Sequence, residues 1–420
     1  MSALQHLSLQ LNTTICDELI DDNVSYKRRV EAVEKAQKWR YIFDKSKLIY
    51  KYFRCETLKT VFGFNERPLS DEEAEYPLAY GIVAYKHIDQ IYYMLSAFYH
   101  PQNLYCIALD SKASFVYKKQ VDLLQLCFPN IRHIDMKIEW CEYGILRGVM
   151  SCVEYLVQSS NKWKYYQYLS GFDLPIKTNH EMVRIFKQLN NTINMEILRF
   201  PIDFCEYTRN WSMYNRKFLF LLLQRPVPYG MNMFKSSVSA LIPHRVAKEM
   251  VENEKAVALY KYLNGTICPD ESFWLTAAGN KKIFPMPGSI NATKWLDFLE
   301  YRRSIEVARN LPIPYYISRF QVWENSGFSK LCKIVSGSCV FGVKDIPILV
   351  KRPELVVHKL YLNYQPAAYF CFYKYVRERA LGNITDFNPK PYAEIPFVAV
   401  SKGARVEDVL FPLENQDHYW

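Results

Sequence analysis

The sequence lacks the short motifs by which many nucleotide-dependent and metal-dependent enzymes are identified. It has only 14 glycines in 420 residues, and it contains no Walker A motif, no G-x-G-x-x-G and no H-E-x-x-H. A loop that surrounds phosphate with backbone amides needs glycine at fixed spacings. The sequence therefore argues against a glycine-lined phosphate site.

Long apolar segments are missing as well. Residues 1–20, MSALQHLSLQLNTTICDELI, contain neither a basic n-region nor an apolar stretch long enough for a signal peptide or anchor. The longest apolar run, residues 218–223 (FLFLLL), is far short of the ~20 residues that cross a bilayer, so it is predicted to be core. Either an anchor is missing from this sequence or the chain is cytosolic.

Basic residues are in excess but form no cluster. The chain has 53 Lys and Arg against 43 Asp and Glu, which gives a net charge of +10 and a pI near 8.9. No run of five or more basic residues occurs, and no nucleic-acid-binding motif accompanies the charge. A solvated basic surface explains this pattern, and we expect no nucleic-acid partner.

Cysteines and glycosylation sequons are frequent. None of the 11 cysteines forms the C-x-x-C pair of a zinc site, and this number favours disulfides in an oxidising compartment. Seven N-x-S/T sequons indicate the same compartment. They begin at Asn12, Asn23, Asn190, Asn210, Asn264, Asn291 and Asn383.

The hydrophobic pattern predicts an α/β domain. Half of the residues are hydrophobic and 15% are aromatic, which is enough for a large core. Apolar strands are predicted at residues 78–85, 103–110, 130–134 and 165–171, and amphipathic helices at 88–98, 115–127 and 149–156. This alternation is typical of a mostly parallel central sheet with helices on both faces.

The chain divides into three predicted regions: an N-terminal stem or cap at 1–75, the main domain at 76–375, and a C-terminal extension at 376–420. Within the main domain, residues 284–330 contain PMPG and LPIPYY, segments that are predicted to be irregular and to wrap the sheet. Ligands of open parallel sheets bind beyond the carboxyl ends of the strands. Tyr85, Asp110 and Asp173 lie at such ends.

Five blocks follow one another in a specific order. They are PLAYGIVAYKHID (77–89), HPQNLYCIALDSKA (100–113), WKYYQYLSGFDLPIKTN (163–179), CPDESFW (268–274) and SCVFGVKD (338–345). In sequence and order they resemble the core-2/I-branching β-1,6-N-acetylglucosaminyltransferases, and the resemblance extends over roughly residues 16–375. It implies a GT-A-type fold, an inverting mechanism, a UDP-sugar donor and a type II membrane protein of the Golgi.

The resemblance assigns the catalytic base to Glu271. Inversion at a sugar carbon needs one carboxylate that deprotonates the acceptor hydroxyl as it attacks. Without the resemblance, Asp270 and Glu271 would be interpreted as acidic residues at a helix N-terminus, because ESFWLTAA resembles a helix start.

The donor site is also implied by the resemblance, which assigns to it Val83, Ala84, Tyr85, Asp110, Ser111, Lys112 and Tyr143. An unpaired Asp110 at the end of a buried strand would be costly, and a hydrogen bond to the nucleotide would relieve that cost. For Tyr85 and Tyr143, the alternative to a role in donor binding is that the two side chains only pack against other aromatic residues.

No metal cofactor is expected. Most GT-A enzymes bind a divalent ion through Asp-x-Asp, but this chain has Asp110-Ser111-Lys112, a poor site for Mg²⁺ or Mn²⁺. The family instead places basic side chains at the diphosphate. Lys359 matches the family's lysine, whereas its arginine is replaced by Ser336, and Lys333 is a candidate substitute.

Acceptor and cysteine positions complete the resemblance. Glu196, Arg209 and Trp211 are the nearest matches to the acceptor-binding residues. The implied disulfides are Cys16–Cys371, Cys55–Cys127 and Cys332–Cys339, with Cys106 paired to Cys152. Cys141, Cys205 and Cys268 remain unassigned, and one of them is a candidate free thiol.

We therefore expect transfer of N-acetylglucosamine from UDP-GlcNAc to a glycoprotein glycan, with β-1,6 branching of O-glycans. A xylosyl donor is the enzymatic alternative. A non-catalytic homologue that binds glycans or nucleotides is the other alternative, favoured by Ser336 and opposed by Glu271, because a pure binder needs no base.

Overall fold

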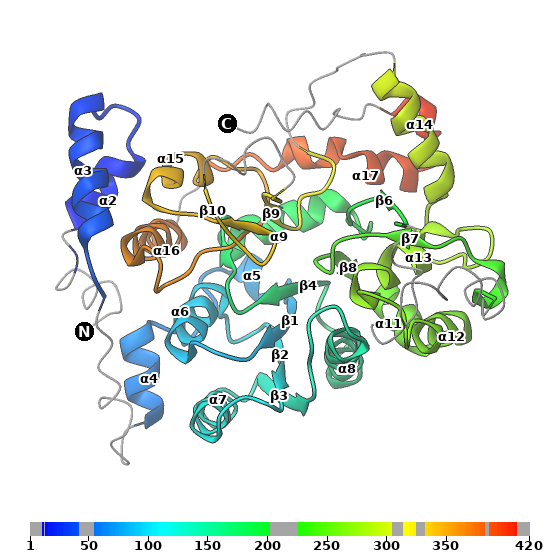
Figure 1. The fold of residues 1–420 in the computed structure, drawn as a ribbon, viewed down its shortest axis with the longest axis horizontal. Helices are drawn as coiled ribbons and strands as arrows, with labels where there is room; N and C mark the ends of the chain where they lie inside the picture. The colour runs from blue at the N-terminus through cyan, green and yellow to red at the C-terminus, as the bar shows by residue number, and fades with distance from the viewer. Residues whose placement is uncertain are drawn as a thin grey trace, which may run out of the picture.

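The computed structural model describes residues 11, 13–41, 54–201, 226–304, 314–324, 332–382 and 386–409. Its centre is a five-stranded sheet with the order β3-β2-β1-β4-β8, surrounded by helices (Figure 1). The strands are β1 (Ala79–Ala84), β2 (Leu104–Asp110), β3 (Ile131–Met136), β4 (Tyr165–Ser170) and β8 (Leu241–Pro243). The first four are parallel and β8 is antiparallel to β4, which confirms the predicted mostly parallel sheet.

Helices cover both faces of this sheet. In Figure 1, α6 (Ile88–Phe98) and α7 (Phe115–Cys127) lie on one side and α8 (Tyr143–Ser159) lies on the other. Ten of the 11 residues of α6 are buried, because other elements pack around the helix as well as the sheet. The predicted strands and helices of this region are confirmed, with differences of a few residues at their ends.

The strand order creates one favourable place for a ligand. The chain moves outward from β1 through β2 to β3, and then returns to place β4 on the other side of β1. The helix that follows β1 (α6) and the helix that leads into β4 (α8) therefore lie on opposite faces of the sheet. At such a switch point, open α/β sheets bind their ligands in a crevice beyond the carboxyl ends of the two strands.

Small sheets extend the fold beyond the end of β4. A three-stranded sheet combines β5 (Leu174–Pro175), β12 (Val356–His358) and β9 (Phe320–Gln321). A hairpin of β10 (Lys333–Val335) and β11 (Ser338–Val340) lies nearby, and β6 (Leu198–Arg199) pairs with β7 (Phe234–Lys235). Because β5 follows β4 after three residues, its pairing with β12 brings the C-terminal half of the chain to the crevice.

The remaining helices pack around these sheets. They are α2 (Thr13–Ile20), α3 (Tyr26–Lys38), α4 (Arg54–Phe62), α5 (Asp71–Ala74), α9 (Asn179–Leu189), α11 (His244–Glu252), α12 (Glu254–Tyr262), α13 (Phe273–Gly279), α14 (Ala292–Ser304), α15 (Ile346–Leu349), α16 (Pro366–Leu381) and α17 (Pro396–Ser401). Single 3-10 turns include η3 (Pro228–Gly230), η4 (Pro269–Glu271), η6 (Val343–Asp345), η7 (Lys390–Glu394) and η8 (Val406–Asp408).

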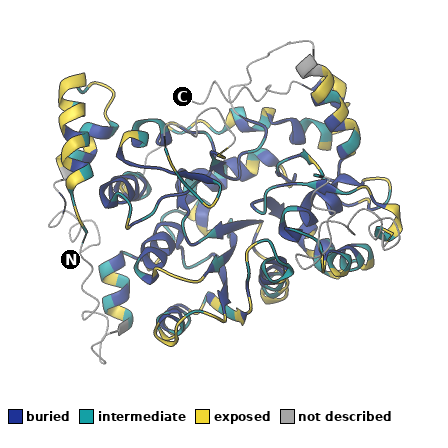
Figure 2. Ribbon diagram, in the orientation of Figure 1, coloured by how far each residue is buried: buried dark blue, intermediate teal, exposed yellow. Residues whose placement is uncertain are grey.

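The core is continuous across these elements. Figure 2 shows the sheet and the inner faces of its helices buried, and much of α3 exposed. One hydrophobic cluster runs from Leu11 to Val409 and includes the fully buried Trp163, Trp274 and Trp295. The division into three regions stays a prediction, although α16 continues through its boundary at residues 375 and 376.

The two segments predicted to be irregular, PMPG (285–288) and LPIPYY (311–316), contain no helix or strand where the structure describes them. Between them α14 forms, with Asn291 accepting a hydrogen bond from the amide of Lys294 at the helix start. This cap and the burial of Trp295 favour the helix. Residues 218–223 lie outside the described part of the chain.

Five disulfides join the described elements. The four predicted pairs are confirmed: Cys16–Cys371, Cys55–Cys127, Cys106–Cys152 and Cys332–Cys339. The fifth, Cys141–Cys268, joins two of the cysteines that had no assigned partner. Neither is therefore the free thiol, and Cys205 lies outside the described residues.

Two surface properties bear on the cellular compartment. Asn23, Asn190, Asn264 and Asn291 of the sequons are exposed, whereas Asn12, Asn210 and Asn383 lie outside the described residues. Across the described ranges, every helix is too short or too polar to cross a bilayer.

Candidate functional site

The carboxyl ends of β1 and β4 define the candidate site. Tyr85 and Lys86 follow β1, and both are exposed. Asp173 lies three residues beyond β4 in a turn whose first amide, from Gly171, donates to the carbonyl of Val83 at 3.2 Å. Groups from both sides of the switch point therefore meet at one edge of the sheet.

Asp173 is the centre of a buried polar network. Its side chain is fully buried, with Oδ2 2.6 Å from Arg319 Nη2 and Oδ1 2.7 Å from His358 Nδ1. The amide of Ser170 also donates to Oδ2, at 2.6 Å. Burial alone would raise the pKa of Asp173, but Arg319, His358 and this amide lower it below its ordinary value. Asp173 is therefore a buried carboxylate with its charge compensated.

His358 is the neutral partner in this network. Burial lowers the pKa of its imidazole to about 4, and Arg319 acts in the same direction against the opposing effect of Asp173. Since Asp173 is ionised, His358 donates from Nδ1 and is held in one orientation. This orientation fixes the backbone that continues into Lys359.

Lys359 is the first cation of the site. Its residue is only 4% exposed, and its Nζ donates to the carbonyl of Val335 at 2.5 Å. Burial lowers the pKa of Lys359 to about 8; Asp173 opposes this shift, and Lys86 and Arg319 add to it. The contact with Val335 also places Ser336, the position of the family's arginine, next to Lys359.

The second cation of the site is Lys86, which lies beside an aromatic cluster formed by Tyr85, Phe172 and Tyr361. Lys86 Nζ lies 4.8 Å from the ring centre of Tyr85 and 5.5 Å from that of Phe172. The rings of Phe172 and Tyr361 are 4.6 Å apart, and Lys359 Nζ is 5.7 Å from the centre of Tyr361. Lys86 and Lys359 thus border the same cluster, and within the described ranges Lys86 has no carboxylate partner.

Glu271 presents a carboxylate from the turn η4. Its side chain is 23% exposed and lies 3.1 Å from Lys235 Nζ on β7. The carbonyl of Glu271 accepts from the amide of Ser236 at 2.7 Å, so this turn is attached to the strand that carries Lys235. A reachable carboxylate with a fixed cation beside it is suited to accept a proton.

The neighbouring Asp270 has the opposite character. It is buried, and among the described residues its Oδ1 has no hydrogen-bond partner. Burial and the charge of Glu271 raise the pKa of Asp270 to about 7. Of these two adjacent carboxyl groups, the buried one therefore keeps its proton up to neutral pH.

The turn η4 lies at the carboxyl edge of the central sheet. Cys268, directly before η4, is bonded to Cys141, which follows the end of β3, and the amide of Cys268 donates to the carbonyl of Cys141 at 3.0 Å. On β4, Tyr168 lies close to Arg319, whose Cζ is 5.1 Å from the centre of the tyrosine ring. Burial raises the pKa of Tyr168, Arg319 lowers it, and the charges of Asp173 and Asp270 raise it further.

The predicted donor residues gather at the ends of β1 and β2. Val83 and Ala84 end β1 below the exposed Tyr85, and Asp110, Ser111 and Lys112 follow one another at the end of β2. Asp110 has partners within the chain that reduce the cost of burying its carboxylate. Its Oδ1 accepts from the amides of Lys112 at 3.1 Å and Ile138 at 3.4 Å, and Lys112 Nζ is 3.7 Å from Oδ2.

The structure describes Tyr143 and one of the three predicted acceptor residues. Tyr143 begins α8 and packs against Tyr260, with ring centres 5.2 Å apart. Glu196 precedes β6 and acts on buried Tyr316, whose pKa is raised by burial and then by this carboxylate. Arg209 and Trp211 lie outside the described residues.

Four residues of the site were missed by the sequence analysis: Lys86, Lys235, Arg319 and His358. His358 is next to Lys359, and Lys86 lies within the first family block, so both had a weak signal. Arg319 and Lys235 had none, because their roles come from contacts with residues far away in the chain.

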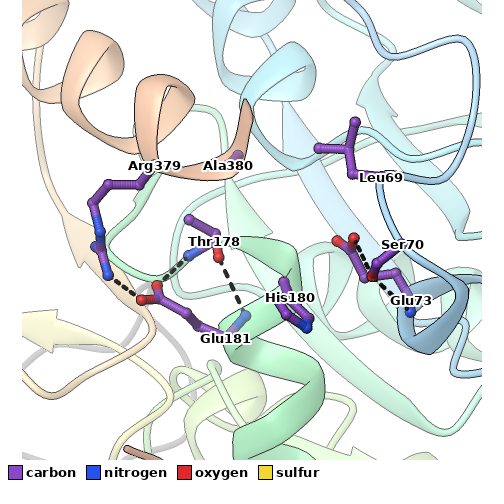
Figure 3. A pocket seen from close by; sticks show the side chains of 8 residues that line it. All are labelled: Leu69, Ser70, Glu73, Thr178, His180, Glu181, Arg379 and Ala380. Atoms are coloured by element: carbon purple, nitrogen blue, oxygen red, sulfur yellow. Dashed lines mark hydrogen bonds and ion pairs between the residues drawn. The ribbon is translucent and has the colours of Figure 1, made fainter. Parts of the chain in front are cut away.

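A polar cavity elsewhere in the molecule is distinct from this site. Figure 3 shows Glu73, Thr178, Glu181 and Arg379 around a space of about 10 Å³, enough for about one water molecule. Glu73 is connected through Asn179 to Asn103, immediately before β2. The cavity therefore lies toward the amino ends of the strands.

Comparison with known proteins agrees with this geometry. Residues 78–303 match the family model of the Core-2/I-branching enzyme. The chain is 27% identical over 338 residues to the Homo sapiens beta-1,3-galactosyl-O-glycosyl-glycoprotein beta-1,6-N-acetylglucosaminyltransferase 3, covering 78% of this chain and 74% of the relative. It is also 27% identical over 365 residues to the Mus musculus N-acetyllactosaminide beta-1,6-N-acetylglucosaminyl-transferase, covering 82% and 84%.

The proton on Asp270 predicts a pH-dependent stability. The folded chain holds this proton up to about pH 7, whereas an ordinary Asp releases it near 3.8. Its contribution to stability is therefore complete below pH 3.8 and is lost as the pH rises to about 7. Asp270→Asn, which stays neutral, should raise the free energy of unfolding at pH 8 by up to about 4 kcal/mol more than at pH 4, at about 1.4 kcal/mol per pKa unit.

Urea denaturation at the two pH values measures this difference. Exposed Asp386→Asn is the matched control and should show no such dependence. If Asp270→Asn changed the free energy of unfolding by the same amount at both pH values, Asp270 would ionise normally in the folded chain.

Proposed function

Because the chain belongs to the Core-2/I-branching enzyme family, we propose that it transfers N-acetylglucosamine from UDP-GlcNAc to a glycoprotein glycan, with inversion and without a metal ion. The names of its relatives support this activity and an O-glycan acceptor branched through a β-1,6 linkage. The mostly parallel sheet supports a GT-A-type fold. We further propose that the enzyme acts in the Golgi lumen, since its disulfides suit an oxidising compartment.

The observation that carries the proposal is the position of Glu271. Its carboxylate is reachable and is compensated by Lys235 at 3.1 Å, and its turn is joined through Cys268 to Cys141, beyond the carboxyl end of β3. Lys86 and Lys359 border the aromatic cluster at the carboxyl ends of neighbouring strands of the same sheet. A base and a pair of cations at one edge are what an inverting transfer from a nucleoside diphosphate needs.

Glu271 takes the proton of the acceptor hydroxyl as its oxygen bonds to the anomeric carbon. The bond from that carbon to the UDP oxygen breaks at the opposite face, and the bonding electrons leave with UDP. Glu196 precedes β6, which pairs with the strand β7 that carries Lys235, and is the proposed acceptor contact. Lys235 remains beside Glu271 and orients its carboxylate before the proton transfer.

The diphosphate is proposed to bind Lys359 and Lys86. Both ammonium groups border the aromatic cluster, and an anion between them would relieve their mutual repulsion. Lys333 is the less suitable second cation, because the ring that its Nζ approaches, Tyr364, is not part of the cluster that Lys86 and Lys359 border. Val83, Ala84, Tyr85, Asp110, Ser111 and Tyr143 remain the proposed contacts of uridine and sugar.

Glu271→Gln should fold normally and bind UDP, but lower kcat by the ~10²–10⁴-fold typical of a lost general base. Initial rates of UDP release with a glycan panel measure this. Glu252→Gln, an exposed carboxylate on α11, is the matched control and should keep wild-type turnover. Turnover of purified Glu271→Gln at the wild-type rate would remove Glu271 from the role of base.

Chelation should leave the activity intact. Lys112 Nζ lies 3.7 Å from Asp110 Oδ2, so an ammonium group stands where Asp-x-Asp enzymes have their second carboxylate. Rates measured in EDTA, and again after adding excess Mn²⁺, should agree within about twofold. Inactivation by EDTA that Mn²⁺ reverses would contradict the metal-free mechanism.

Lys359→Ala should weaken UDP binding at pH 7 by roughly 10- to 150-fold, the equivalent of one charge-assisted hydrogen bond of about 1.5–3 kcal/mol. The pKa of Lys359 is about 8 without ligand, and bound phosphate would raise it. UDP affinity of the wild type should therefore fall as the pH rises above 8, and Lys359→Ala should lack this fall.

Calorimetric titration with UDP from pH 7 to 9 measures both effects. Lys86→Ala should also weaken binding, and Ser336→Arg should tighten it, whereas Lys333→Ala is the control with unchanged affinity. UDP binding that is indifferent to Lys359→Ala, Lys86→Ala and Ser336→Arg would place the diphosphate elsewhere.

A further inference from the structure

The disulfide Cys141–Cys268 joins the two segments that carry opposite halves of the site. Cys268 comes directly before η4, which ends at Glu271, and Cys141 lies two residues before Tyr143. The two cysteines are 127 residues apart in the sequence. Of the five disulfides, this one is attached to the residue that we propose as the base.

Both cysteines have a backbone conformation that must be held in place. The φ angles are 58° at Cys141 and 45° at Cys268, in the left-handed region that residues other than glycine rarely adopt. The amide of Cys268 also donates to the carbonyl of Cys141 at 3.0 Å. Such conformations persist where surrounding contacts enforce them, and here the covalent bridge and this hydrogen bond do so together.

The turn that presents Glu271 has few other attachments. It is a single 3-10 turn of three residues, a length that has no stability of its own. Apart from the pair of Glu271 with Lys235, its side chains give it little support, because Asp270 Oδ1, Ser272 Oγ and the neighbouring Ser236 Oγ lack hydrogen-bond partners among the described residues. Its backbone is held on one side by the amide of Ser236 and on the other by Cys268.

We propose that the Cys141–Cys268 disulfide is a positioning device that holds Glu271 at the distance from the donor at which proton transfer occurs. This inference rests on the proposed role of Glu271. Cys268 adjoins the turn of Glu271, whereas Lys86 and Lys359 lie on other segments, so we expect the bridge to act on turnover and to leave UDP affinity unchanged. Misplacing a catalytic group by about 1 Å can cost ~10²-fold in rate.

The test is the double variant Cys141→Ser/Cys268→Ser. We expect kcat to fall by roughly 10- to 100-fold, with UDP affinity within about twofold of wild type by calorimetry. The matched control is Cys55→Ser/Cys127→Ser, which removes the bridge between α4 and α7, away from the site, and should keep kcat. An equal loss of kcat in the control would show a general effect of lost bridges and overturn the inference.

If the serine pair does not fold, Cys141→Gly/Cys268→Gly replaces it, because glycine adopts positive φ without steric cost. The same fall in kcat is expected. A glycine pair with wild-type kcat would mean that the turn is held without the bridge, and the inference would be wrong.

Adding Glu271→Gln to the double variant separates this inference from the proposed function. If the bridge acts through Glu271, its loss should have no further effect on kcat in the Glu271→Gln background. Glu271→Gln with wild-type turnover would instead refute the proposed function itself. An impaired Glu271→Gln beside an unimpaired serine pair would refute only the positioning role.

Discussion

The carboxylate of Asp173 is fully buried at the end of β4, where only the surrounding groups can compensate its charge. Arg319, His358 and the amide of Ser170 do so, and each comes from a different part of the chain. Removing one partner of a buried ion pair typically costs about 3–5 kcal/mol, because the remaining charge is left unpaired. This requirement holds the end of the central sheet against β9 and β12.

The position of the cations follows from that constraint. The hydrogen bond from His358 to Asp173 fixes the orientation of the imidazole, and the next residue in the chain is Lys359. Lys359 is thereby brought next to Tyr361 and within the electrostatic influence of Lys86, which reaches the same cluster from the end of β1. The buried carboxylate of Asp173 thus helps to fix the position of a positively charged side chain at the candidate site.

The adjacent carboxyl groups of Asp270 and Glu271 lie in different environments. Asp270 is buried and holds its proton up to about pH 7, whereas Glu271 is partly exposed and paired with Lys235. The sequence motif contains both and cannot distinguish them, since their difference arises from burial and from a lysine on β7. The bridge at Cys268 joins the turn of this pair of groups to Cys141, beyond the end of β3.

Local sequence determined the elements of this protein. The alternation of apolar strands and helical stripes from residue 78 onward predicted β1 to β4 and the helices between them, because periodicities of two and 3.6 depend only on neighbouring residues. The ends of the strands, and with them Tyr85 and Asp110, followed from the same pattern. The resemblance to a family, carried by five short blocks, pointed to Glu271, Lys359 and four of the disulfides.

The tertiary structure decided what those elements bring together. Arg319 and Lys235 carry no signal in the sequence, the Cys141–Cys268 bridge spans 127 residues, and Asp110 is satisfied by the amides of Lys112 and Ile138. Hydrogen bonds, ion pairs and burial depend on distances in space between residues that are far apart in the chain. Those distances exist only after the sheet has formed and the C-terminal strands have packed against its end.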